Sequence, residues 1–323
     1  MCWCYDLSMK MTALILLSLL AFTTAATAQP TNDWITGLPR EAIRVKAWPD
    51  GKKVAICFML NAEVWGHGKG PNFHPEMADR RPDLVDEGFR QYAIEWGLPR
   101  VGRLFREQDV PLTIGLSAQF PEQRPEVWKQ LRASVPKAPI VAHGLNNSTD
   151  LLPLEKGTEA QRVYIKLTLD MIEKSTGVRS IGWSSPQVYP NAETFAATAA
   201  EGIRYTLDSM DSDVLSRLST QPKPLLMVPY PSPVVDMSQY LVRFKEATDL
   251  ERLWIDYVTE LAREAEADPG RDATVVAIGI HPFVVGTPAG AAALRRVLEN
   301  FKKQKLVWLT DVESVLKAAG EKL

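Results

Sequence analysis

Short apolar segments alternate with longer amphipathic segments along most of the sequence, and this alternation limits the possible folds more than any other feature. The expected strands cover residues 54–60, 112–116, 140–142, 181–183, 205–208, 225–228, 274–280 and 306–309. The expected helices cover residues 86–108, 124–133, 159–175, 192–200, 250–267, 291–301 and the chain after residue 311. Strands that alternate with helices in this way indicate a parallel sheet covered by helices.

The number and spacing of these segments favour an α/β fold of the (β/α) barrel type over an open sheet, with about seven parallel strands. No linker rich in proline, glycine or serine divides the chain. We therefore expect one domain at residues 51–323, preceded by a lead-in segment at 29–50. In the helix at 159–175 we predict that Val163, Leu167 and Met171 form one apolar face. In 86–108 the predicted apolar stripe consists of Phe89, Ala93, Trp96, Val101 and Leu104.

A positive charge, a short apolar run and an Ala-x-Ala site follow one another at the start of the sequence. Lys10 precedes the apolar run 11–22, and Ala26-Thr27-Ala28 comes after it. This order is typical of a secretory signal peptide. We expect residues 1–28 to be removed and the protein to be secreted or periplasmic, without stable membrane insertion after cleavage. The alternative is an uncleaved anchor, although the run is shorter than the roughly 20 residues that span a bilayer.

The net charge and the cysteine content argue against nucleic-acid binding, an intrachain disulfide and a catalytic cysteine. The formal net charge is -2 at pH 7, which argues against a nucleic-acid partner. Cys2 and Cys4 lie in the expected signal peptide, so Cys57 has no partner for an intrachain disulfide. The apolar neighbours of Cys57 indicate a buried side chain rather than a nucleophile.

Polar and aromatic side chains gather directly after the expected strands. In a (β/α) barrel the carboxyl ends of the strands meet at one mouth, where functional residues collect. A carboxylate and two histidines there suit hydrolysis, with amides to orient a substrate. The candidates are Asn61, Glu63, Trp65, His143, Asn147, Trp183, Asp208, Asp211, Asp213, Tyr230 and His281.

Each of these candidates also has a purely structural interpretation. Glu63 could lie on the surface and His143 could belong to a turn. The three aspartates of residues 208–213 could form a turn and nothing more. Trp65 and Trp183 could stack on sugar rings or pack in the core, and the sequence alone favours the core.

Five segments in this order resemble a known family. They are residues 142–148 (AHGLNNS), 182–183 (GW), 228–231 (VPYP), 280–286 (IHPFVVG) and 307–310 (VWLT). They are similar to the polysaccharide deacetylases, carbohydrate esterase family four, and within them to the allantoinase-like branch. The resemblance covers roughly residues 54–315. It implies a distorted or incomplete (β/α) barrel.

The resemblance also implies a metal-assisted hydrolysis. Active members of the family hold a divalent metal, commonly zinc, through one aspartate and two histidines. A second aspartate acts as base on the metal-bound water, and a late histidine acts as acid. The reaction removes an N- or O-acetyl group from a sugar polymer.

Matched position by position, this chain departs from the family's metal site. The paired aspartates are replaced by Asn61 and the nearby Glu63, and the second metal histidine by Asn147. The first metal histidine matches His143 and the acid histidine matches His281. Three protein ligands are usual for zinc, and Glu63 with His143 supplies two. We expect at most a weak divalent-metal site, completed by Asn147, by His67 or by an aspartate of 208–213.

These observations lead to three hypotheses. The first is an exported hydrolase that removes acetyl groups from a glycan or cleaves another non-peptide carbon–nitrogen bond in it, with Glu63 as base or metal ligand and His281 as general acid. The second is a non-catalytic carbohydrate-binding protein of the same fold. The third is an allantoinase-like amidohydrolase of small molecules. Substrate-binding side chains are expected at Asn61, Trp65, Asn147, Trp183, Asp211 and Tyr230. Relatives in the allantoinase-like branch also suggest a homo-oligomer.

Overall fold

An eleven-stranded sheet organises the computed structural model, which describes residues 31–73, 79, 83–148 and 153–323. The expected signal peptide at 1–28 lies outside the described residues. The strands are β1 (Thr31–Asn32), β2 (Pro39–Ala42), β3 (Val54–Ala62), β4 (Thr113–Leu116), β5 (Ile140–Ala142), β6 (Gly182–Trp183), β7 (Tyr205–Ser209), β8 (Ser216–Leu218), β9 (Leu225–Pro229), β10 (Thr274–Ile280) and β11 (Val307–Thr310).

The strands follow the order β1-β2-β8-β9-β7-β6-β5-β4-β3-β10, with β11 also paired to β3. Strands β3 to β7, β9, β10 and β11 are parallel, whereas β8, β2 and β1 extend the β9 edge in antiparallel pairs. No strand pairing joins β9 to β10 among the described residues, so the barrel does not close. The structure thus confirms an α/β fold with a distorted, incomplete barrel, and its parallel strands number eight where about seven were expected.

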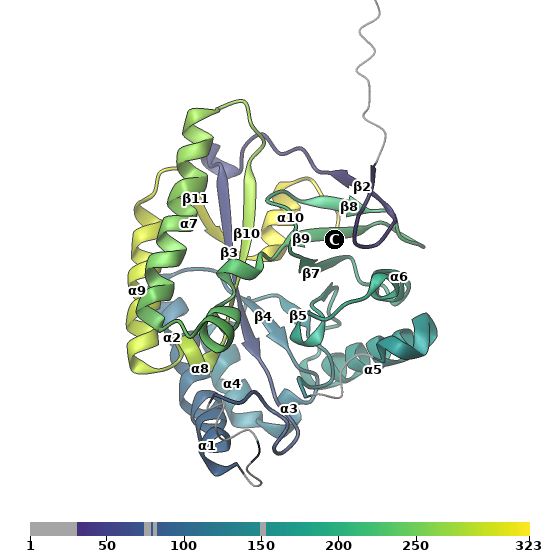
Figure 1. Cartoon of the computed structure of the whole chain (residues 1–323), viewed down its shortest axis with the longest axis vertical. Coiled ribbons are helices and arrows are strands. Elements are labelled where there is room, and N and C mark those ends of the chain that lie inside the picture. The colour runs from purple at the N-terminus through teal and green to yellow at the C-terminus, as the bar shows by residue number, and fades with distance from the viewer. Residues whose placement is uncertain (1–30, 74–78, 80–82, 149–152) are drawn as a thin grey trace, which may run out of the picture.

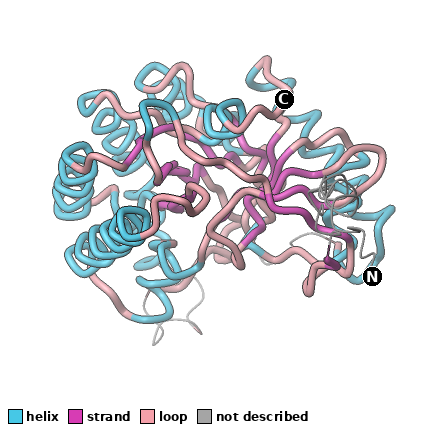
Figure 2. The backbone as a smooth tube through the Cα atoms, turned by 90° about the horizontal axis from the view of Figure 1, so that it is seen from above, coloured by secondary structure: helices cyan, strands magenta, loops and turns pink. Residues whose placement is uncertain are grey.

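Helices surround this sheet (Figures 1 and 2). The α-helices are α1 (Leu84–Tyr92), α2 (Leu98–Gln108), α3 (Phe120–Gln123), α4 (Pro125–Ser134), α5 (Gly157–Thr176), α6 (Ala192–Ala200), α7 (Ala247–Ala267), α8 (Pro282–Val285), α9 (Pro288–Lys303) and α10 (Val312–Ala318). The π-helical turns are η3 (Ala93–Gly97) and η7 (Ser238–Val242), and the 3-10 turns are η1 (Pro49–Gly51), η4 (Leu154–Lys156), η5 (Pro186–Val188) and η6 (Ser232–Val234). Helices α7 and α9 lie side by side outside β3 and β11 (Figure 1).

Strand β3 is buried on both faces. Alternate side chains of a strand point to opposite faces, and here the even positions from Val54 to Ala62 join the core under the helices. The odd positions Ala55, Cys57 and Met59 join a second core inside the barrel. This two-sided burial explains why the strand is apolar almost throughout, and Cys57 is buried as expected.

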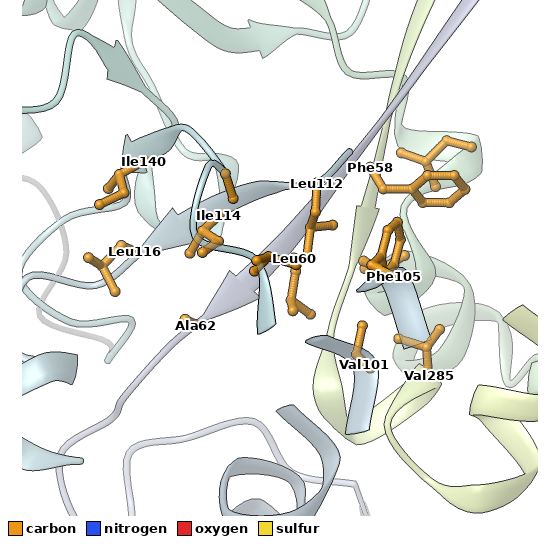
Figure 3. Packing of buried hydrophobic residues seen from close by; sticks show 14 of the residues in the cluster. Phe58, Leu60, Ala62, Val101, Phe105, Leu112, Ile114, Leu116, Ile140 and Val285 are labelled. Carbon is orange, nitrogen blue, oxygen red and sulfur yellow. The ribbon is translucent and has the colours of Figure 1, made fainter. Parts of the chain in front are cut away.

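Aromatic packing anchors the outer core to β3. The Phe58 ring meets Phe105 of α2 edge to face at 5.5 Å between ring centroids and stacks on Phe301 of α9 at 6.4 Å. Trp254 of α7 approaches the same ring at 6.5 Å. Figure 3 shows Phe58, Leu60 and Ala62 following one face of the strand toward the side chains of α2 and α8. One side chain of β3 thereby joins three helices.

One predicted helix face was wrong, and one position of another. Val163 and Leu167 are 61% and 48% exposed, because the buried face of α5 is made by Ile165, Leu169 and Ile172 together with the polar Gln161 and Thr168. Gln161 donates to Asn191 at 3.1 Å, and a polar side chain can be buried when a neighbouring element supplies such a bond. In the stripe predicted at 86–108, Ala93, Val101 and Leu104 are buried as expected, and only Trp96 is exposed. The short antiparallel strands β1, β2 and β8 were not predicted either. No described helix is long and apolar enough to cross a membrane.

We expect the Phe58→Ala variant to lose about 3–5 kcal/mol of unfolding free energy, because the deletion leaves a cavity between three helices and β3. Urea denaturation followed by circular dichroism measures this loss. The control is Val163→Ala on the exposed face of α5, which should change stability by less than about 0.5 kcal/mol. Equal effects of the two variants would contradict the packing described for β3.

Candidate active site

A cavity of about 450 Å³ lies where the parallel strands end. Strands β3, β5, β9 and β10 lead into it, as expected for the mouth of a (β/α) barrel. Most of the sequence-predicted residues meet there: Asn61, Glu63, Trp65, His143, Asn147, Tyr230 and His281 all line the cavity. Further lining comes from Lys69–Asn72, Gln187–Tyr189, Val235, Met237, Ser238, Leu241 and Val242.

Strand alternation explains why these side chains face inward. Asn61 and Glu63 continue the odd-numbered, interior face of β3, and His281 continues the interior face of β10 beyond Gly279. Two glycines leave room for their neighbours. A Cβ on Gly115 would lie 2.6 Å from Asn61 Oδ1, and one on Gly279 would lie 1.8 Å from the Tyr230 hydroxyl. Glycine at these positions therefore lets larger polar side chains occupy the interior.

Glu63 is a buried carboxylate held by two polar neighbours. Its Oε1 atom lies 3.0 Å from His143 Nε2 and accepts a hydrogen bond from the Asn147 amide. Its Oε2 atom has no hydrogen-bond partner among the described residues. Burial favours a higher pKa for Glu63, but the nearby His281 charge and the contacts with His143 and Asn147 outweigh it and lower the pKa. Glu63 is thus ionised, with one oxygen free to accept a proton.

His143 is held between two oxygen atoms. Nδ1 lies 2.9 Å from the Ser184 carbonyl oxygen, and Nε2 lies 3.0 Å from Glu63 Oε1. Both oxygens can accept a hydrogen bond from the ring. The two side chains of this pair are nearly inaccessible to solvent, with 4% of His143 and 1% of Glu63 exposed.

His281 forms a second buried pair with Asp236, a residue that sequence reasoning missed. The His281 Nδ1 atom lies 2.6 Å from Asp236 Oδ1, and the backbone N–H of His281 donates to Oδ2 at 2.6 Å. This arrangement leaves Nε2 directed at the cavity, 3.8 Å from Glu63 Oε1. Asp236 follows β9 by several residues instead of ending a strand, so a search restricted to strand ends could not find it.

The environment of His281 favours its protonated form. Burial alone would lower the pKa of His281, but the charges of Asp236 and Glu63 outweigh it and raise the pKa. Burial raises the pKa of Asp236, against the opposing charge of His281. The ring of Phe283 stacks on the imidazole, with centroids 5.4 Å apart. Charge and packing together hold a proton donor in one orientation.

Asn61 and Tyr230 add neutral polar groups beside His281. Asn61 Nδ2 lies 3.1 Å from His281 Nε2 and 3.4 Å from the Ile280 carbonyl oxygen. An amide can donate to the neutral imidazole or, after rotation by 180°, accept from the protonated one. Burial raises the pKa of Tyr230 far above its ordinary value, against a contact with Asn61, so the hydroxyl keeps its proton. Both residues can donate hydrogen bonds into the cavity.

Two residues predicted to bind substrate lie away from the cavity. Trp183 is fully buried, and its indole N–H donates to the Ser185 hydroxyl at 3.0 Å, so it belongs to the core, as the sequence favoured. Asp211 forms an ion pair with Arg40 at 2.6 Å, away from the cavity lining. Position after a strand does not ensure access to the mouth, because loop packing decides where the side chain goes. Trp65 does reach the cavity, beside Phe283 at 5.8 Å between centroids.

The remaining metal candidates also lie apart. Asp208 is buried and accepts hydrogen bonds from Ser185, behind the cavity lining. His67 is exposed, and Asp213 is exposed as well. No group of three His, Cys, Asp or Glu side chains within the described parts of the chain could hold a metal ion.

The donors that are present do not fit the metal site of the family. An asparagine binds a metal through its amide oxygen, and in Asn147 this oxygen accepts a hydrogen bond from the Gln187 backbone N–H at 3.0 Å, while the amide nitrogen donates to Glu63. Both nitrogens of His143 already face oxygen acceptors. The Glu63 carboxylate is thus the partner of both the Asn147 amide and the His143 ring.

The chain resembles polysaccharide deacetylases along most of its length. It is 23% identical over 319 residues to a "Putative polysaccharide deacetylase" of Schizosaccharomyces pombe, which covers 89% of this chain and 97% of that protein. No protein-family model matches the sequence.

Solved structures show the same fold. A "probable Polysaccharide deacetylase" from Pseudomonas aeruginosa superposes with a TM-score of 0.73 at 24% identity, over 85% of this chain and 93% of that one. A "putative polysaccharide deacetylase" from Mycobacterium smegmatis has a TM-score of 0.70 at 22% identity, over 88% and 95% of the two chains. The Puue allantoinase has a TM-score of 0.71 at 25% identity, over 85% and 92%. The fold and the sequence relative together confirm the predicted resemblance to polysaccharide deacetylases and their allantoinase-like branch.

Proposed function

We propose that this protein is a polysaccharide deacetylase-like hydrolase that removes acetyl groups from a glycan, or cleaves another non-peptide carbon–nitrogen bond in it, without a metal. The observation that carries the proposal is the pair of Glu63 and His281 in one cavity, with Glu63 Oε1 and His281 Nε2 3.8 Å apart. The names of the sequence relative and of the structural neighbours support the substrate class. We further propose export through the signal peptide at 1–28.

In this proposal Glu63 acts as the general base and His281 as the general acid. Glu63 Oε2 accepts a proton from a water molecule while the water oxygen attacks the acyl carbon. The carbon–nitrogen bond then breaks, and His281 Nε2 gives its proton to the leaving nitrogen. Products are the free carboxylic acid and an amine, and the proton on Glu63 returns to His281 or to solvent. Asp236 orients His281 and stabilises its charged form, which is the role of the carboxylate in a catalytic triad.

Neutral donors near the acid and base can stabilise the oxyanion that forms on the acyl oxygen. The Asn61 amide and the Tyr230 hydroxyl lie beside His281 in a site shielded from solvent. Hydrogen bonds to a developing charge are strong where water is excluded. The charge of His281 and the contacts with His143 and Asn147 lower the pKa of Glu63 and keep the base ionised despite its burial.

The geometry of the cavity also bears on two other functions, sugar binding without catalysis and hydrolysis of a small amide. A binding protein would present aromatic faces to sugar rings. Trp65 and Tyr189 line the cavity and could do so, whereas Trp183 is buried and Tyr230 is only 1% exposed. An amidohydrolase of small molecules remains a candidate, because the Puue allantoinase shares the fold at 25% identity and the cavity could hold one compact molecule.

Removal of either catalytic group should abolish turnover while the protein stays folded. We expect Glu63→Gln and His281→Asn to lower kcat by about 10²–10⁴-fold, because each removes one proton-transfer group. Acetate and amine release from acetylated oligosaccharides measures the rates. His67→Asn, which changes an exposed histidine outside the cavity lining, is the control and should keep full activity. Retention of normal turnover by Glu63→Gln would exclude this residue as the base.

The pH dependence of kcat/KM should reflect the shifted pKa values of Glu63 and His281. Glu63 must be ionised, and its pKa is lowered from 4.5, so kcat/KM should fall only below that pH. His281 must be protonated, and its pKa is raised from 6.5, so the alkaline decline should lie above that pH. Asp236→Asn removes a cause of the higher pKa and should move the alkaline limb to lower pH. An unchanged alkaline limb in this variant would show that His281 is not the acid.

Zinc binding distinguishes this site from the metal-dependent one. We expect the native protein to lose added zinc on dialysis, whereas Asn147→His combined with Asn61→Asp should bind zinc at least about tenfold more tightly, because it restores three usual ligands. Isothermal titration calorimetry measures both affinities. Asn146→His with Asn61→Asp is the matched control, since Asn146 bonds to Gln119 and does not line the cavity. Stoichiometric zinc in the dialysed native protein would refute a metal-free site.

A further inference from the structure

We infer that the active-site cavity selects an acyl group longer than acetyl, through an apolar wall formed by Val235, Met237, Leu241 and Val242. All four side chains line the cavity that holds Glu63 and His281. This inference rests on the proposed function, since it names the acyl group that the proposed hydrolase accepts. The substrate that fits this cavity carries a saturated acyl chain that packs along the wall.

The apolar wall begins directly beside the proton donor. Val235 and Met237 flank Asp236, whose carboxylate binds the ring and the backbone of His281 at 2.6 Å each. Val235 is 5% exposed and Val242 is 72% exposed, so the wall extends from the buried catalytic groups to the surface. A chain attached to the reacting carbonyl carbon can therefore follow the wall outward. An acetyl methyl would contact only its innermost part.

The segment that carries the wall is held in place from three sides. Trp254 of α7 donates its indole N–H to the Val234 carbonyl oxygen at 2.9 Å, and the Gln239 amide donates to Pro233 at 2.8 Å. Tyr240 meets Phe73 edge to face at 6.3 Å between centroids. A wall fixed in this way keeps its shape when the substrate binds, as a specificity pocket requires.

The wall offers little to a sugar ring. Its four side chains are aliphatic apart from the thioether of Met237, although the neighbouring Ser238 adds one hydroxyl to the cavity lining. The Val235 carbonyl oxygen already accepts from Gln239 N–H at 3.3 Å. Asp236 likewise accepts from the Met237 N–H. Hydroxyl groups buried there would lack partners, which weakens binding. Polar lining comes instead from Lys69 and Asn72 after β3 and Gln187 after β6, where the hydroxyls of the amine component fit.

A chain-length series tests this assignment. The substrates are N-acetyl-, N-butyryl- and N-hexanoylglucosamine, and release of glucosamine is measured with the intact protein. We expect kcat/KM to rise by up to roughly fourfold for each added methylene that the wall buries. Leu241→Asn and, at the exposed end, Val242→Asn should lower the ratio of hexanoyl to acetyl kcat/KM. Val163→Asn on the outer face of α5 should leave the ratio unchanged.

The outcomes separate this inference from the proposed function. Hydrolysis with equal or falling kcat/KM along the series would overturn the acyl assignment and leave the hydrolase standing. Absence of hydrolysis with every substrate would instead count against the proposed function. In that case calorimetry with the Glu63→Gln variant decides: tighter binding of N-hexanoylglucosamine than of N-acetylglucosamine supports the apolar wall, and equal binding refutes it.

Discussion

The burial of strand β3 on both faces is the constraint on which the rest of the structure depends. A strand has two edges, and β3 pairs with β10 along one and with β11 and then β4 along the other. Its even positions serve the core under the helices and its odd positions serve the barrel interior. The first polar side chains beyond the odd-numbered apolar ones, Asn61 and Glu63, must therefore enter the interior. The same alternation in β10 directs His281 to the same place.

A polar interior costs free energy, and the site offsets this cost by pairing its charges. Glu63 contacts His143, and His281 contacts Asp236, with every one of these side chains less than a tenth exposed. Buried charges are tolerated when each has a partner of opposite sign and further hydrogen bonds. Asn147 supplies one such bond to Glu63, and the backbone of His281 supplies one to Asp236. The result is an ionised carboxylate and a protonated imidazole side by side, which is the arrangement that acid–base hydrolysis needs.

The proposed metal-free site differs from the metal-dependent pattern in what its carboxylate contacts. In the metal-dependent pattern, the cation neutralises its ionised ligands. Here Glu63 Oε1 lies 3.0 Å from His143 Nε2 and accepts a hydrogen bond from the Asn147 amide.

Much of the fold was predictable from the sequence, because apolar runs mark the strands that are buried on both faces. The strands at 140–142 and 274–280 were predicted to the residue, and the others to within a residue or two. The short antiparallel strands β1, β2 and β8 were missed, since strands of two to four residues leave too little pattern. Helix faces were less predictable. Val163 is exposed and Gln161 buried because the neighbouring α6 decides which side of α5 is covered.

For the candidate site, the sequence by itself determined that Asn61, Glu63, His143 and His281 would meet at one mouth, because strand direction and side-chain alternation are local properties. Only the tertiary structure decided what each of them contacts. It brought Asp236 to His281 from the helical turn that leads into η7, 45 residues earlier in the chain. It also turned the Asn147 amide toward Glu63. Such contacts depend on how separate loops pack against one another, and no periodicity along the chain records that packing.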